Sequence, residues 1–253
     1  DQPRSRGLGD VYKRQHQWGL HIYLGKFGAG KTCSMVRDAY FICKRYPDVT
    51  IITNLKLENF PEDTKILPLT CIQDILNAPD DTVVLIDEIG TIFNSRDFAN
   101  GKTKDGEGGL PKILFQHICQ CRHRHLVIYG TVQRWGFLEK QLREITNDVT
   151  VCSAFPFHPF SRMITNWVYD AEEYNLFYQS PIRPLAPLSG EVWIQSDFFR
   201  NLYDTQEMVN TLLTMEYISD EDIERNRQFE ALGLPAPMDK KGEKKLRNNL
   251  RNR

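Results

Sequence analysis

The stretch "HIYLGKFGAGKTCSMV", residues 21–36, decides the fold. Within it, Gly25, Gly30, Lys31 and Thr32 match the pattern G-x-x-x-x-G-K-[ST] without a gap. Glycines let the backbone curl so that successive N–H groups point at phosphate oxygens. The lysine reaches the β- and γ-phosphates as a point charge, and the threonine hydroxyl is a ligand for Mg²⁺. The pattern therefore predicts a loop that binds nucleotide phosphates.

The segments on either side of this loop supply the context that the motif requires. Residues 20–24, "LHIYL", are typical of a strand, and residues 33–46, "CSMVRDAYFICKRY", are typical of a helix, which Pro47 ends. The positive N-terminal end of such a helix points at the same phosphates. The predicted nucleotide-binding residues are Gly25, Lys26, Phe27, Gly28, Ala29, Gly30, Lys31, Thr32 and Cys33.

Two adjacent acids follow another apolar strand. In "TVVLIDEIG", residues 82–90, positions 83–86 are typical of a central parallel strand that is buried on both faces. Asp87 stands at the carboxyl end of this strand, where open α/β sheets bind ligands, so we predict that it binds Mg²⁺ together with Thr32. Glu88 is predicted to be the catalytic base that deprotonates the attacking water. The adjacent acids favour hydrolysis of ATP over phosphoryl transfer to a small molecule.

Strands and helices alternate along the rest of residues 16–155. The expected strands are 49–54, 126–133 and 148–155, the expected helices are 72–77, 111–124 and 137–145, and 57–70 reads as a loop. This alternation predicts an α/β fold in which helices flank a central parallel sheet. Strand 126–133 ends in Thr131 and Gln133. A polar side chain that closes a strand beside the nucleotide predicts a γ-phosphate sensor, and we assign this role to Gln133.

A small, mostly antiparallel extension is expected after this core. Within residues 156–210, "MITNWVYD" (163–170) and "EVWIQSDFF" (191–199) have the composition of strands. The 253 residues, 41% of them hydrophobic, suffice for one large domain with such an appendage.

No apolar run reaches about 18 residues, so we expect no transmembrane helix in the residues given. Six cysteines without a secretory signal predict free thiols in a reducing compartment.

The two ends of the chain stand apart from the domain. Residues 1–15 resemble the translation of a sequencing adapter, so we leave them out of the fold prediction and expect the genuine chain to begin near His16. Residues 211–253 read as a helical and basic tail, in which residues 239–253 carry a net charge of +5 although the whole chain carries −1. This tail is suited to lie against anionic lipid, and a solvated tail is the alternative.

A run of histidines and cysteines resembles a metal site but has the wrong spacing for one. Residues 117–125 alternate His117, Cys119, Cys121, His123 and His125. The spacing matches neither C-x-x-C nor H-x₃-H, and the segment reads as a helix that enters a strand. We therefore predict no metal there.

Together these motifs give the chain a resemblance to the zonula occludens toxin family, which includes the assembly ATPase of filamentous phages. The matching motifs are the phosphate loop, "TN" at 53–54, "LIDEIGTIFNSR" (85–96), "CRHRHLVIYGTVQ" (121–133), "LEKQLRE" (138–144) and "YDT" (203–205). The resemblance implies a RecA-like P-loop NTPase with an extra strand between the two nucleotide-binding strands. It implies ATP and Mg²⁺ as cofactors, with Lys31 and Glu88 in catalysis. Arg96 and Arg143 stand in matching motifs and are candidate arginine fingers.

The resemblance also implies partners and a location. It implies extrusion of a single-stranded DNA phage from the cytoplasmic side of a bacterial host's inner membrane, in complex with phage or host membrane assembly proteins. A homo-oligomer in ATP, single-stranded DNA and the membrane surface are the further partners expected. Members of the family typically carry a transmembrane helix after a basic stretch, whereas here the basic stretch is present without the helix. A P-loop kinase or another P-loop NTPase acting on a small substrate stays open as the alternative.

Overall fold

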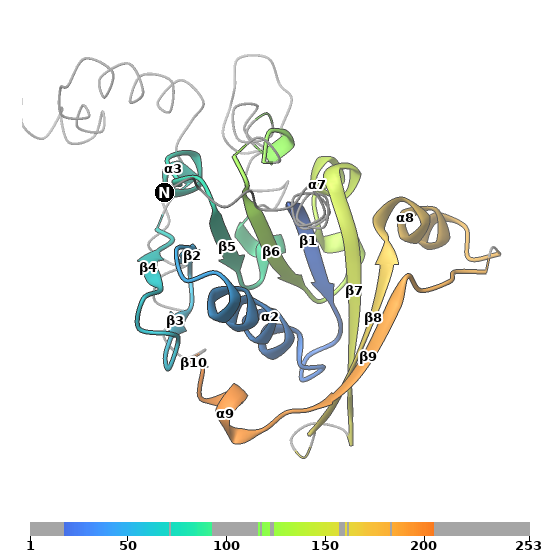
Figure 1. Cartoon of the computed structure of the whole chain (residues 1–253). Coiled ribbons are helices and arrows are strands. Elements are labelled where there is room, and N and C mark those ends of the chain that lie inside the picture. Colours follow the sequence, from blue (N-terminus) through green and yellow to red (C-terminus); the bar gives the residue numbers. More distant parts are fainter. Residues whose placement is uncertain are drawn as a thin grey trace, which may run out of the picture. The chain divides into compact units, whose positions relative to one another are not determined.

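The structure, a computed structural model, describes residues 18–70, 72–92, 116, 118–121, 124–156, 160, 162–182 and 184–204. The predicted adapter segment, Arg96 and the basic tail lie outside the described residues. A single eight-stranded sheet dominates the described part (Figure 1). Its strands are β1 (Gly19–Leu24), β2 (Thr50–Thr53), β4 (Lys65–Pro68), β5 (Thr82–Ile86), β6 (Val127–Val132), β7 (Thr146–Phe155), β8 (Met163–Asp170) and β9 (Ser189–Ile194).

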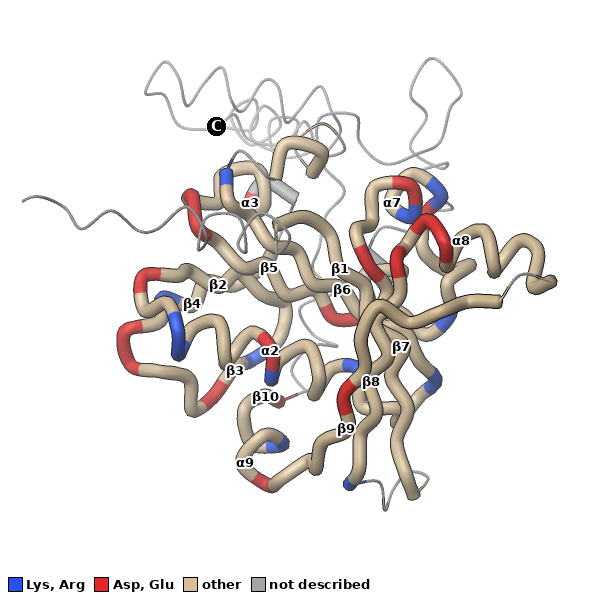
Figure 2. The backbone as a smooth tube through the Cα atoms, turned by 45° about the vertical axis from the view of Figure 1, so that its right-hand side comes forward, with Lys and Arg blue, Asp and Glu red and all other residues tan. Residues whose placement is uncertain are grey.

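The remaining elements are short, with two exceptions. The helices are α2 (Lys31–Arg45), α3 (Ile72–Leu76), α4 (Ile89–Ile92), α7 (Lys140–Ile145), α8 (Ala171–Gln179) and α9 (Asp197–Arg200), and η1 (Trp135–Phe137) is a 3₁₀ helix. Strands β3 (Lys56–Leu57) and β10 (Tyr203–Asp204) form a separate antiparallel pair. Acidic and basic residues both occur around α7 and α8 (Figure 2).

The strand order confirms the predicted α/β fold. The order is β4-β2-β5-β6-β1-β7-β8-β9. The first six strands are parallel to their neighbours, and β8 and β9 are antiparallel additions at one edge. Strand β6 lies between β5 and β1, as expected for a RecA-like P-loop NTPase with an extra strand between its nucleotide-binding strands. The antiparallel extension therefore continues the core sheet.

Helices cover both faces of the parallel part. Helix α2 lies across one face of the sheet (Figure 1). Its Met35, Val36 and Ala39 are fully buried in a cluster with residues of β2 and β5. Tyr129 of β6 packs against the α2 cluster. The next residue, Gly130, faces the other side of the sheet, where Ile89 of α4 packs against it. Burial on both faces explains why β5 is a continuous apolar run.

Two local expectations were wrong, and one helix was not predicted. Residues 57–70 contain the edge strand β4, whose exposed side chains and terminal Pro68 give a weak strand pattern. The extension contains α8, which starts where the Asp170 side chain accepts hydrogen bonds from two backbone amides. The strand expected at 191–199 is Ser189–Ile194, and Ser196 caps the short helix α9 that follows.

Candidate active site

The predicted phosphate loop joins β1 to α2, and the neighbouring strands β7 and β8 pack closely against two of its glycines. Gly30 has φ +85°, in the left-handed region, and a Cβ there would lie 2.5 Å from Cδ1 of Ile164 in β8. A Cβ on Gly25 would lie 2.7 Å from the carbonyl oxygen of Cys152 in β7. Both positions therefore require glycine, and the extension strand β8 forms part of the wall behind the loop.

The helix end and the lysine at the loop are suited to an anion. No side chain among the described residues caps the N-terminus of α2, and its first turn contains no acid. Lys31 is buried, and its Nζ donates a hydrogen bond to the carbonyl oxygen of Lys26 at 3.3 Å. Phe27, at the tip of the loop, is 80% exposed. An uncapped helix end beside a buried ammonium group suits a phosphate.

The structure brings together the two predicted metal ligands. Thr32 Oγ1 donates a hydrogen bond to Asp87 Oδ1 at 2.9 Å, and Thr131 Oγ1 donates to the same oxygen at 2.6 Å. Burial raises the pKa of the Asp87 carboxyl above its usual value, and these two hydrogen bonds oppose the rise. A buried carboxylate beside a hydroxyl is an oxygen donor set of the kind that Mg²⁺ prefers. Thr32 and Asp87 therefore fit the predicted role.

The predicted base and the predicted sensor are also neighbours. Gln133 Nε2 donates a hydrogen bond to Glu88 Oε1 at 3.1 Å. Gln133 directly follows β6 and Glu88 follows Asp87 after β5, and the arrowheads of β5 and β6 point the same way in Figure 1. Glu88 has φ +53°, an uncommon backbone conformation for a residue with a side chain.

Arg143 lines a pocket of about 450 Å³ that Glu88 of the same chain also lines. Its Nε is buried and has no hydrogen-bond partner among the described residues. Arg143 lies on α7, the helix that follows η1. Arg143 and the predicted base therefore share one pocket, whereas Arg96 lies outside the described residues.

Two polar residues of the site received no predicted role. Asn54 follows β2, and its side chain accepts a hydrogen bond from the Asp87 amide at 2.9 Å and donates one to the Asp87 carbonyl oxygen at 3.1 Å. The Thr131 hydroxyl accepts a hydrogen bond from the Glu88 amide at 2.8 Å. Both residues lie at the ends of strands that flank β5. Their signals in the sequence were polarity at a strand end and, for Asn54, its place in the "TN" motif.

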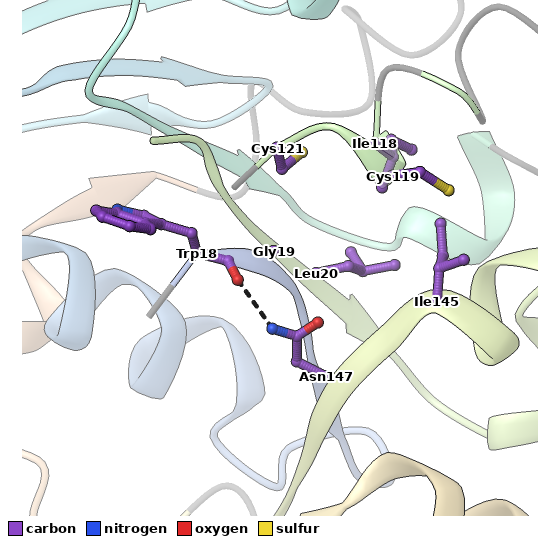
Figure 3. A pocket seen from close by; sticks show the side chains of 8 residues that line it. All are labelled: Trp18, Gly19, Leu20, Ile118, Cys119, Cys121, Ile145 and Asn147. Carbon is purple, nitrogen blue, oxygen red and sulfur yellow. Dashed lines mark hydrogen bonds between the residues drawn. The ribbon is translucent and has the colours of Figure 1, made fainter. Parts of the chain in front are cut away.

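The cysteine-containing segment lines a different pocket, at the amino end of β1. This pocket has a volume of about 360 Å³, and Figure 3 shows Cys119 beside Ile118 and Cys121 apart from them. Asn147 Nδ2 donates a hydrogen bond to the carbonyl oxygen of Trp18 there, at 2.8 Å. The described residues contain no group of three side chains able to hold a metal, and His117 and His123 lie outside them.

Comparison with known proteins gives structural similarity alone. No protein-family model matches the chain, and no curated protein matches it. Similar solved structures include the N-terminal domain of zonular occludens toxin from Neisseria meningitidis, with a TM-score of 0.48 and 15% identity over 74% of this chain and 98% of that one. The flagellar accessory protein FlaH from Methanocaldococcus jannaschii has a TM-score of 0.41 and 16% identity over 66% and 85% of the two chains. The genome packaging NTPase B204 from Sulfolobus turreted icosahedral virus 2, in complex with ATP-gammaS, has a TM-score of 0.42 and 10% identity over 70% and 96%.

A structure from the family that the motifs resemble is therefore among the structures similar to this chain. Within the part that the structure describes, no helix is both long enough and apolar enough to span a bilayer.

Proposed function

We propose that the chain binds ATP with Mg²⁺ and hydrolyses it. The observation that carries the proposal is a pair of contacts: Thr32, in the first turn of α2, donates to Asp87, and Gln133 donates to Glu88. Asp87, Glu88 and Gln133 follow the carboxyl ends of the adjacent strands β5 and β6. Lys31 stands at the start of the helix beside them, at the mouth of the phosphate loop. Phosphoryl transfer to water requires a loop that binds the phosphates, oxygen ligands for Mg²⁺ and a carboxylate that acts as the base.

Each of these residues has a distinct task in the proposed reaction. The backbone amides of the loop and Lys31 hold the β- and γ-phosphates. Thr32 and Asp87 would hold Mg²⁺, which neutralises phosphate charge when it is bound. Glu88 orients a water molecule and accepts its proton as the water oxygen attacks the γ-phosphorus. Gln133, already hydrogen-bonded to Glu88, is suited to report the state of the γ-phosphate to the base.

Two substitutions separate binding from hydrolysis. Lys31→Ala removes the charge on the ground-state phosphates, so we expect ATP affinity to fall at least tenfold. Glu88→Gln keeps the size of the side chain but loses its basicity, so we expect unchanged ATP affinity and a turnover lowered at least 100-fold. Lys56→Ala and Glu58→Gln, at an exposed ion pair of 3.6 Å outside the site, are the matched controls. Hydrolysis by Glu88→Gln at the wild-type rate would refute the assignment of the base.

We further propose that this ATPase is a motor for the assembly and export of a filamentous, single-stranded DNA phage. The sequence motifs that resemble the zonula occludens toxin family support this step, as do the hydrogen bond between Gln133 and the base and the pocket that Arg143 lines together with it. A homo-oligomer in ATP, membrane assembly proteins, single-stranded DNA and the inner-membrane surface are the proposed partners. Stimulation of turnover by single-stranded DNA or by lipid vesicles supports a motor, whereas stimulation only by a small phosphate acceptor favours a P-loop kinase.

A further inference from the structure

One buried hydroxyl joins the predicted metal ligand to the predicted base. Thr131 is fully buried in β6. Its Oγ1 donates to Asp87 Oδ1 at 2.6 Å and accepts from the Glu88 amide at 2.8 Å. A hydroxyl has one donor and two acceptor positions, so these two bonds use its donor and one of its acceptors and fix the direction of its hydrogen. The same atom therefore fixes the carboxylate of one residue and the backbone of the next.

The strand on the other side of β5 completes the arrangement. Asn54, at the end of β2, makes hydrogen bonds to both the amide and the carbonyl oxygen of Asp87. Asn54 is buried, so water does not compete for these bonds. The turn after β5 is thus held by Asn54 through the backbone of Asp87 and by Thr131 through its side chain and the next amide.

The backbone of Glu88 requires such support. Its φ of +53° lies in the left-handed region, which is unfavourable for a residue with a Cβ. Strained backbone of this kind persists where surrounding contacts determine it. The Glu88 amide donates to Thr131, and the Glu88 carbonyl oxygen accepts from the amide and the hydroxyl of Thr91, each at 2.8 Å. Of these contacts, the Thr131 hydroxyl is the one that also reaches Asp87, and in this conformation Glu88 Oε1 accepts from Gln133.

We propose that Thr131 is a positioning residue that sets the catalytic base relative to the metal ligand. The inference rests on the proposed ATP hydrolysis, because Glu88 must act as the base for its position to matter. Loss of the hydroxyl leaves the phosphate loop and Lys31 intact. It should therefore lower kcat without weakening the binding of nucleotide in the absence of Mg²⁺.

The test compares Thr131→Val, which keeps the shape and removes the hydroxyl, with Thr131→Ser, which keeps the hydroxyl. We expect Thr131→Val to lower kcat 10–100-fold, as is typical when the support of a ligand is removed, and to leave ADP affinity without Mg²⁺ within about twofold. Thr131→Ser should restore most of the turnover. If Thr131→Val does not fold, Thr131→Cys, a poor donor, replaces it.

A second readout is independent of activity. Hydrogen exchange at the Glu88 amide should accelerate at least tenfold in Thr131→Val and stay slow in Thr131→Ser. Thr82→Val is the matched control, because this buried threonine lies at the other end of β5 and donates its hydroxyl to the Pro79 carbonyl oxygen at 2.7 Å. It should change neither kcat nor exchange at Glu88.

The outcomes distinguish the two proposals. Wild-type kcat in Thr131→Val, or unchanged exchange at Glu88, would overturn the positioning role. A wild-type protein that does not hydrolyse ATP, but whose Glu88 amide depends on the Thr131 hydroxyl, would refute the proposed function and keep the structural link. An equal loss of kcat in Thr82→Val would show a general effect of stability and overturn the inference.

Discussion

Replacing Asn166 with alanine should both destabilise the protein and weaken nucleotide binding. Asn166 lies on β8 and is 2% exposed. Its Oδ1 accepts a hydrogen bond from Ser34 Oγ of α2 at 3.1 Å, and its Nδ2 donates one to Glu191 Oε1 of β9 at 3.1 Å. The same glutamate accepts two hydrogen bonds from Arg37 of α2, at 2.6 and 3.2 Å. Asn166 therefore joins the extension to the helix that carries the phosphate loop.

The magnitude follows from the groups that the substitution leaves behind. Asn166→Ala removes the buried hydrogen bond from Ser34 and the partly buried hydrogen bond to Glu191, and it takes away the acceptor of the buried Ser34 hydroxyl. A lost hydrogen bond costs about 0.5–1.5 kcal/mol, and a buried group left without its partner costs about 1–3 kcal/mol, so we expect the free energy of unfolding to fall by about 2–4 kcal/mol. Ile164, two residues earlier, contacts the loop at Gly30, so a shift of β8 should also lower ATP affinity several-fold.

Urea unfolding and nucleotide titration measure the two effects. Asn147→Ala is the matched control, since this asparagine lies on the neighbouring strand β7 and makes an exposed hydrogen bond to the Trp18 carbonyl oxygen. The double variant with Ser34→Ala should lose less than the sum of the single losses, because the two side chains share one bond. A loss below about 0.5 kcal/mol for Asn166→Ala, the range of an ordinary surface substitution, would refute the argument.

Two further predictions concern a titrating acid and the candidate finger. Burial raises the pKa of Asp38 from 3.8 to about 6, against the hydrogen bond from the Tyr23 hydroxyl, so the free energy of unfolding should decrease as pH rises through this interval. Asp38→Asn should lack this decrease in urea unfolding measured from pH 3.5 to 7. Arg143→Ala should lower kcat at least 100-fold. If Arg143 acts on the nucleotide of a neighbouring subunit, mixing this variant with Lys31→Ala restores turnover, whereas no rescue contradicts a finger that acts between subunits.

The parts of the fold that could be predicted from the sequence are those marked by a contiguous motif or by a run of apolar residues. The phosphate loop is a contiguous motif, and β5 is an apolar run because both of its faces are buried. Edge strands lack this signal, which is why β4, exposed along most of its length, read as a loop. Helix α8 begins at a capping aspartate within a segment rich in aromatic residues, where strand propensity and helix capping compete.

The contacts of Thr131 and Asn54 with Asp87 could not be predicted from the sequence, for a different reason. Thr131 meets Asp87 because β6 pairs with β5 in the register that places Ile86 opposite Gly130. Asn54 meets Asp87 because β2 pairs with β5 on the other side, with Thr53 opposite Leu85. Strand order and register depend on contacts between residues far apart in the chain, so no local pattern marks these two residues as partners of the acids.

The same dependence explains why the extension belongs to the site. Strand β8 reaches the loop at Ile164 and reaches α2 at Asn166, on one face of the same strand. The loop glycine at this contact has no room for a side chain, so the position of β8 and the conformation of the loop are determined together. The antiparallel strands are therefore a structural part of the proposed nucleotide site, because they contact both the phosphate loop and the first turns of α2.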